Sequence, residues 1–132
     1  MHDLDIVYIK GNPMSGTPFL HEQIDNTIIG LINQYSYLIL DSEQKNLSGI
    51  KLPKAKVYIG FSRGSRYLNK LDNSSLKISI GGVSGSRIHL FKNENDHILL
   101  GDISNESMEA HFLINENDKI KIKKLLTKTL NI

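Results

Sequence analysis

Five short, largely apolar runs constrain the fold of this 132-residue chain more than any other feature. Short apolar runs that end at glycine or polar residues are typical of buried strands. Between the first two runs, apolar residues recur at helical spacing, and a second amphipathic pattern begins at Asp118. Continuous apolar strands that alternate with helices are typical of a parallel sheet covered on both faces. The five runs are residues 4–9, 37–40, 57–59, 76–80 and 87–91.

We therefore predict an α/β fold, a three-layer sandwich with a mostly parallel five-stranded sheet, in one domain spanning residues 1–132. The first helix begins at Pro18, with Thr17 as N-cap, and ends near Gln34. A second helix follows the third strand to about Leu71, and the last one begins at Asp118. The apolar positions of the first and last helices are Phe19, Leu20, Ile24, Ile28, Leu31, Ile32, Ile120, Ile122, Leu125, Leu126 and Leu130.

Composition excludes several classes of function. The absence of cysteine excludes disulfides, thiol catalysis and zinc–thiolate sites. A net charge of +2 with mixed signs gives no reason to expect nucleic acid or an anionic membrane as a partner. There is no apolar stretch near 20 residues, and the first five residues are acidic where a signal peptide is basic. We expect a cytoplasmic protein with no cofactor.

The third run leads directly into Gly60-Phe61-Ser62-Arg63-Gly64, which has the pattern G-x-S-x-G. After a strand and before a helix, this pattern is typical of a sharp turn that exposes a nucleophilic serine. The turn needs small residues two places before and after the serine, because a side chain there would collide with crossing backbone. It also leaves the amide of Arg63 free to bind an oxyanion. The simpler alternative is that Ser62 is only a small residue in a tight turn.

In a parallel sheet, the segments after the strands meet at the carboxyl edge, where ligands bind. We expect residues 11–17, Ser62, residues 81–86 and residues 93–97 to converge there. A serine nucleophile needs a base, and the base needs an acid to orient it. Of the five histidines, we place His97 and His111 at this edge. The alternative interpretation of His111 is a surface residue that caps the last helix.

These residues resemble those of a very small α/β-hydrolase, over nearly the whole chain. Residues 6–16 resemble the strand and oxyanion loop of that family, and residues 57–68 resemble its nucleophile turn. Residues 88–96 resemble the strand that ends in the acid, and residues from His111 onward resemble the histidine loop and last helix. The order serine, acid, histidine is also the order of the family.

The resemblance implies that Ser62 is the nucleophile, His111 the general base and Asp96 the residue that orients it. The backbone amides of Asn12 and Arg63 would form the oxyanion hole. The short segment between Asp96 and His111 departs from the family, so Asp102 is an alternative acid, and Glu106 a further one.

The chain also departs from the family elsewhere: it has Lys10-Gly11 where His-Gly is frequent, and it lacks two N-terminal strands and a lid. The resemblance implies a carboxylesterase or thioesterase that cleaves small acyl esters, with a small-molecule acyl substrate. The missing strands leave a sheet edge open to a homodimer contact. The same departures favour an alternative, a non-catalytic α/β-hydrolase-like module that binds a ligand or partner. The acidic residues near His97 lack metal-ligand spacing, and residues 11–17 lack the lysine of a phosphate loop.

Overall fold

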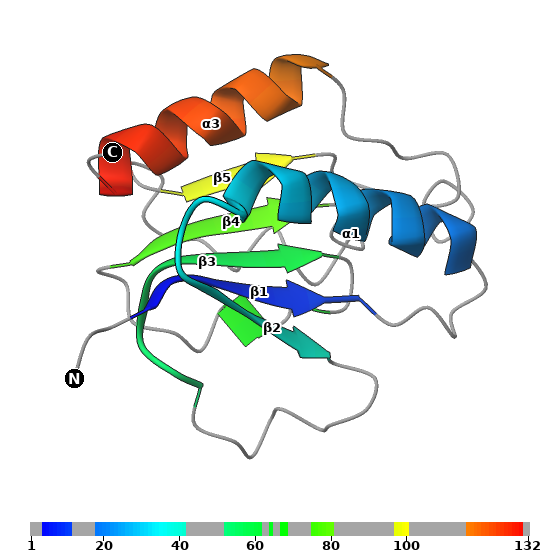
Figure 1. Cartoon of the computed structure of the whole chain (residues 1–132), viewed down its shortest axis with the longest axis horizontal. Coiled ribbons are helices and arrows are strands. Elements are labelled where there is room, and N and C mark those ends of the chain that lie inside the picture. Colours follow the sequence, from blue (N-terminus) through cyan, green and yellow to red (C-terminus); the bar gives the residue numbers. More distant parts are fainter. Residues whose placement is uncertain are drawn as a thin grey trace.

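The computed structural model describes residues 4–11, 18–41, 52–61, 64, 67–68, 75–80, 97–100 and 116–130. Figure 1 shows a twisted sheet with two long helices packed against it. The α/β class predicted from the sequence is confirmed. The elements are β1 (Leu4–Lys10), α1 (Pro18–Ile32), β2 (Tyr37–Asp41), β3 (Ala55–Phe61), β4 (Leu76–Ile80), β5 (His97–Leu100) and α3 (Glu116–Leu130).

The sheet has the strand order β2-β1-β3-β4-β5, and every neighbouring pair is parallel. The chain runs from β1 outward to β2 through α1, then returns past β1 to begin β3. Connections from β1 and β3 therefore leave in opposite directions. The ends of these two strands form the switch point at which open α/β sheets bind their ligands.

Four strands match the predicted runs, but the fifth does not. The predicted strand at residues 87–91 lies outside the described residues, and β4 instead pairs with β5, His97–Leu100. The sequence pattern showed only a weak apolar patch there, because four residues are too few to display a clear period. With the last strand at His97–Leu100, the acid that follows it in the sequence is Asp102, and Asp96 precedes it.

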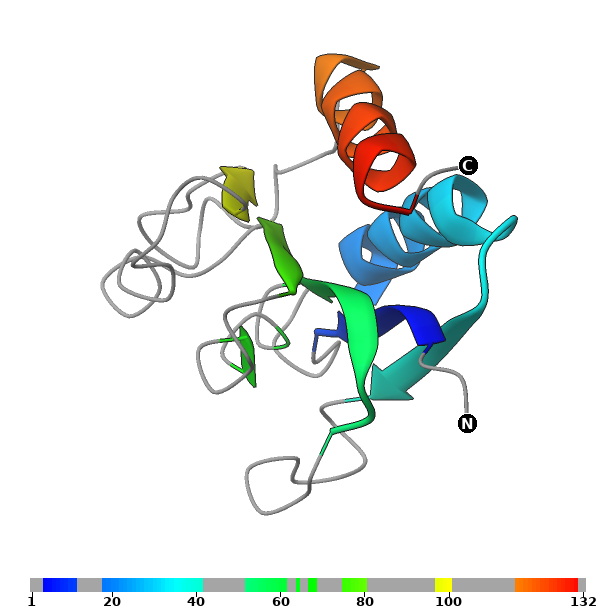
Figure 2. The same cartoon turned by 90° about the vertical axis from the view of Figure 1, so that its left-hand side faces the viewer.

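The two helices cover the same face of the sheet, as Figure 2 shows. On this helix face, residues of β1, β3 and β4 such as Ile6, Val57 and Ile78 form one buried cluster with both helices. On the opposite face, Val7, Ile9, Ala55, Tyr58 and Leu68 form a smaller cluster. Gly64, Tyr67 and Leu68, from the segment predicted to be the second α-helix, are in 3₁₀ conformation. The three-layer arrangement is thus not shown, since both α-helices of the described part lie on one side.

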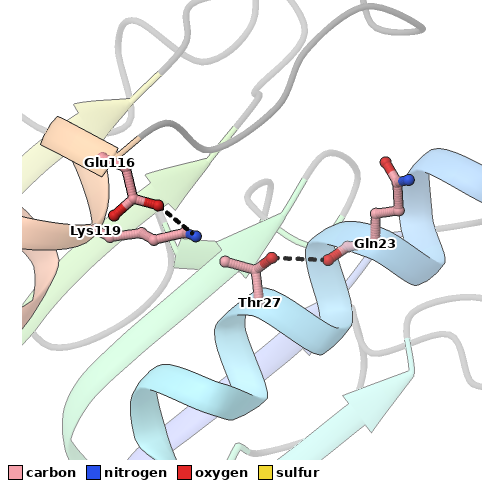
Figure 3. A network of polar contacts seen from close by, with 4 residues as sticks. All are labelled: Gln23, Thr27, Glu116 and Lys119. Carbon is pink, nitrogen blue, oxygen red and sulfur yellow. Dashed lines mark hydrogen bonds and ion pairs between the residues drawn. The ribbon is translucent and has the colours of Figure 1, made fainter.

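Helices α1 and α3 present apolar stripes to the sheet and polar residues to solvent. Residues four apart in α3, Ile122, Leu126 and Leu130, are buried, as helical periodicity requires. Ile120 is 50% exposed, because it lies two positions before Ile122 and so on another side of the helix. Figure 3 shows polar contacts within each helix: the Thr27 hydroxyl donates to the Gln23 carbonyl at 3.0 Å, and Lys119 pairs with Glu116 at 3.1 Å. The two helices therefore pack on the core through their apolar sides.

Strand β2 was expected to be buried, but it lies at the edge of the sheet. Tyr37 and Leu38 are 37% and 36% exposed, and the rest of the strand is half-buried. The same apolar composition serves a central or an edge strand, so the sequence pattern could not distinguish the two. Asp5 and Ser36 fix the start of β2 through two reciprocal hydrogen bonds of 2.9 and 3.2 Å.

Candidate functional site

All five strands end at the same level, which gives the sheet a straight carboxyl edge. Lys10 is level with Asp41 of β2, and Ile9, one residue before Lys10, is level with Gly60 of β3. Phe61, Ile80 and Leu100 end the other strands in register. The chain therefore leaves four of these strands into Gly11, Ser62, Gly81 and Gly101. In the sequence, a small residue therefore follows each of these four strands.

Gly64 packs directly against the backbone at the end of β1. A Cβ added to Gly64 would lie 2.8 Å from the carbonyl oxygen of Lys10 and still nearer to that of Ile9. Real Cβ atoms do not approach backbone this closely, so only glycine fits here. The requirement for a small residue two positions after Ser62, predicted from the pattern, is confirmed at Gly64. The chain that follows β3 therefore crosses over the end of β1.

A polar cluster joins the end of β1 to α1. The Tyr8 hydroxyl donates a hydrogen bond of 2.5 Å to one oxygen of Asp25, and the Lys10 ammonium lies 3.5 Å from the other. Tyr8 is fully buried, while the Asp25 and Lys10 side chains are 13% and 32% exposed. Burial, and then the charge and hydrogen bond of Asp25, raise the pKa of Tyr8 well above 10.0. Tyr8 is therefore a neutral donor throughout the physiological range.

Ser79 occupies the opposite face of the sheet, beside the strand that leads into Ser62. It pairs in register with Gly60, and it is fully buried. Its Oγ has no hydrogen-bond partner in the structure as described. Lys77, two residues earlier on the same face, is also buried. Buried polar groups on an otherwise apolar sheet are uncommon, and an unpartnered hydroxyl reduces stability.

The predicted catalytic residues Ser62, Asp96 and His111, the alternative acid Asp102, and the oxyanion residues Asn12 and Arg63 all lie outside the described residues. Their immediate neighbours are described in several cases. Phe61 ends β3 directly before Ser62, and Lys10 ends β1 two residues before Asn12.

His97 is not at the carboxyl edge, where it was predicted. It opens β5 and pairs with Lys77, near the amino end of β4. The prediction was wrong because it assumed a strand at residues 87–91, which made residues 93–97 the segment after a strand. With β5 at His97–Leu100, the chain reaches the carboxyl edge at Leu100 and continues into Gly101-Asp102.

Sequence reasoning missed the cluster of Tyr8, Asp25 and Lys10. Tyr8 belongs to the first apolar run, and the apolar pattern of α1 does not single out Asp25. Alternation does place Tyr8 and Lys10 on one face of β1, but their distance from Asp25 depends on how α1 packs. That packing is not visible in either pattern alone.

Within the described ranges, no group of three or more His, Cys, Asp or Glu side chains could hold a metal ion. Neither helix there is long and apolar enough to cross a membrane. Comparison with protein-family models, curated proteins and solved structures found no match to this chain. A functional interpretation must therefore come from the residues and the geometry of this chain.

Proposed function

We propose that this protein is a serine hydrolase that cleaves small acyl esters or thioesters through a Ser-His-Asp triad, on a reduced α/β-hydrolase-like fold. Ser62 attacks the carbonyl carbon, and His111 takes the proton of its hydroxyl. The amides of Asn12 and Arg63 stabilise the oxyanion, a contribution of roughly 3–4 kcal/mol per donor in enzymes of this type. The bond to the alcohol or thiol then breaks, and this leaving group takes its proton from His111. Water activated by His111 next attacks the acyl-enzyme, which releases the acid and restores the Ser62 hydroxyl.

The packing of Gly64 on β1 carries the proposal. A sharp turn after a central strand leads the chain across the end of the neighbouring strand. This requires the backbone of the turn to pack closely against the backbone of that strand. Gly64 makes this approach to Ile9 and Lys10. Ser62 and Arg63 are tied covalently between Phe61 and Gly64, and Asn12 is tied to Lys10 through Gly11. Ser62, Arg63 and Asn12 are therefore each within two residues, along the chain, of the contact between Gly64 and the end of β1.

Among the two acids, the register of β5 favours Asp102. Asp102 follows Leu100 by two residues, so at most about 7 Å of chain separates it from the carboxyl edge. Asp96 precedes His97, and β5 rises roughly 10 Å between His97 and Leu100. We therefore propose Asp102 as the residue that orients His111, with Asp96 as the alternative.

The substrate we propose is a small acyl ester, which is what the resemblance to a reduced α/β-hydrolase implies. A cytoplasmic location remains part of the proposal and is supported by the absence of cysteine.

We also propose that the exposed edge of β2 pairs with β2 of a second copy. Exposed Tyr37 and Leu38, with no Lys or Pro in this strand, support that contact. Light scattering of the wild type and Leu38→Lys tests it, since only the variant should be a monomer.

The test of the hydrolase is turnover of p-nitrophenyl acetate and butyrate by the wild type and by Ser62→Ala. Ser65→Ala is the matched control, because Ser65 lies in the same segment but outside the pattern. We expect Ser62→Ala and His111→Ala to lose at least about 100-fold in kcat, and Ser65→Ala to keep wild-type activity. Asp102→Asn should lose far more activity than Asp96→Asn.

Equal turnover by the wild type and Ser62→Ala, or none by either, would rule out the hydrolase. The alternative in that case is a non-catalytic binding module, which uses the same edge of the sheet without chemistry. A greater loss in Asp96→Asn than in Asp102→Asn would overturn the choice of acid alone.

A further inference from the structure

Lys10 contacts both the turn that follows β3 and helix α1. Its carbonyl oxygen lies where Gly64 packs, 2.8 Å from the position of an added Cβ. Its ammonium lies 3.5 Å from Asp25 of α1, on the other side of the sheet from Leu68. The last residue of β1 is thus held through its backbone by the turn after β3 and through its side chain by a helix.

Asp25 binds β1 at two points. One carboxylate oxygen accepts the Tyr8 hydroxyl at 2.5 Å, and the other faces Lys10. Because Tyr8 and Lys10 are two residues apart, both project from the same face of β1 toward α1. A hydrogen bond to a carboxylate in a partly buried site is stronger than one between neutral groups. The Asp25 carboxylate therefore restrains the final three residues of β1 relative to α1.

We propose that Asp25 is a positioning residue for the oxyanion hole. By holding Tyr8 and Lys10, it fixes the end of β1 against Gly64, the two described points from which the chain continues to Asn12 and Arg63. Asn12 lies two residues after Lys10, and Arg63 lies one residue before Gly64. This role rests on the proposed function, since an oxyanion hole matters only to a hydrolase. An oxyanion hole is sensitive to such restraint, because a shift of about 1 Å can cost on the order of 100-fold in rate.

The role predicts a specific kinetic pattern. Oxyanion donors act in the transition state more than in the ground state, so loosening them lowers kcat and leaves KM nearly unchanged. A loss of general stability would also lower the apparent kcat, because less of the enzyme is folded, so kcat is calculated per active site titrated with a fluorophosphonate. The charge of Asp25 is the feature under test, because an amide in its place can still accept the Tyr8 hydroxyl.

The experiment compares the full-length wild type with Asp25→Asn, Lys10→Met and Lys10→Arg. Glu22→Gln is the matched control, because Glu22 is an exposed carboxylate one turn earlier on α1. We expect Asp25→Asn and Lys10→Met to lower kcat for p-nitrophenyl acetate about tenfold, with KM within about twofold of wild type. Lys10→Arg keeps a cation opposite Asp25 and should restore most of kcat, while Glu22→Gln should match the wild type.

Amide chemical shifts of Gly11 and Gly64, measured by NMR in the same proteins, give a readout that does not depend on activity. Both shifts should move in Asp25→Asn and Lys10→Met, and neither should move in Glu22→Gln. Unchanged kcat and unchanged shifts in Asp25→Asn would overturn the positioning role. If the wild type has no hydrolase activity, the proposed function fails, and the role at the oxyanion hole fails with it. In that case moved shifts would show only that Asp25 restrains the end of β1.

Discussion

The two faces of the sheet differ in how they are built. The helix face has a large apolar cluster, to which β1, β3, β4 and both helices contribute fully buried side chains. The opposite face has a smaller cluster, two buried polar residues, Lys77 and Ser79, and a backbone contact at Gly64 that excludes any side chain. The helix face is therefore suited to stabilise the fold. The opposite face carries features that burial of apolar area alone does not explain, and these features surround the strand that leads into Ser62.

The largest effect should come from Gly64→Ala, on the opposite face. The new methyl group would collide with backbone carbonyls of Ile9 and Lys10, which cannot move without distorting β1. We expect a loss of at least about 3 kcal/mol in the free energy of unfolding, measured by urea denaturation.

Gly30→Ala is the control for this substitution. Beyond the neighbouring backbone of α1 itself, no atom lies within 4 Å of an added Cβ at Gly30. Alanine there should stabilise the protein by about 0.5–1 kcal/mol, because it favours the helix. Similar stabilities for the two alanine variants would contradict the close approach of the turn to β1.

The helix face should show the next largest effect, as a pure loss of packing. Ile28 is fully buried between α1 and the sheet, so Ile28→Ala should cost about 2–4 kcal/mol. Ile120→Ala removes a side chain that is half exposed and should cost less than about 0.5 kcal/mol. Urea denaturation of both variants checks the difference, and equal losses would mean that α3 packs through another side.

Tyr8→Phe tests the polar contact between β1 and α1 on the helix face, and its effect depends on pH. Loss of the hydrogen bond to Asp25 should cost about 1–2 kcal/mol near neutral pH. The pKa of Tyr8 is raised in the folded protein, so above about pH 10 the unfolded chain ionises this tyrosine while the folded protein keeps its proton. The stability linked to Tyr8 is thus complete below that pH and is lost as the pH rises further.

The wild type should therefore lose more stability than Tyr8→Phe when urea denaturation is repeated at alkaline pH. Parallel losses in the two proteins would show that Tyr8 titrates normally and that its contact with Asp25 is not retained in solution.

Apart from the control variants, Ser79→Ala should give the smallest effect, and one of opposite sign. Its hydroxyl is buried without a partner among the described residues, so its removal should stabilise the protein by about 1 kcal/mol. Ser75→Ala is the matched control, because the Ser75 hydroxyl donates to the Ala55 carbonyl at 2.9 Å and its loss should destabilise. Thermal denaturation of both variants checks the signs. A destabilised Ser79→Ala would mean that this hydroxyl is satisfied in solution.

Apolar patterns in the sequence were sufficient to predict that β1 to β4, α1 and α3 exist. Burial requires a short apolar run in each strand and apolar residues at helical spacing in each helix. They failed at β5, which is too short to stand out, and they did not indicate that β2 lies at the sheet edge, because this position depends on strand order. The small residue required at position 64 followed from local turn geometry and was confirmed. The ion pair of Lys10 with Asp25 could not be predicted, since it depends on the packing of α1 on the sheet. The acid assignment depended on β5, so the error in that strand favoured Asp96 over Asp102.

The most direct test of the central claim is reaction of the intact protein with a fluorophosphonate, followed by tryptic digestion and mass spectrometry. Cleavage after Lys56 and Arg63 releases residues 57–63, a peptide in which Ser62 is the only serine. The proposal predicts one adduct on this peptide, assigned to Ser62 by fragmentation and absent from His111→Ala. An unmodified peptide, or an adduct on another serine such as Ser65, would contradict it.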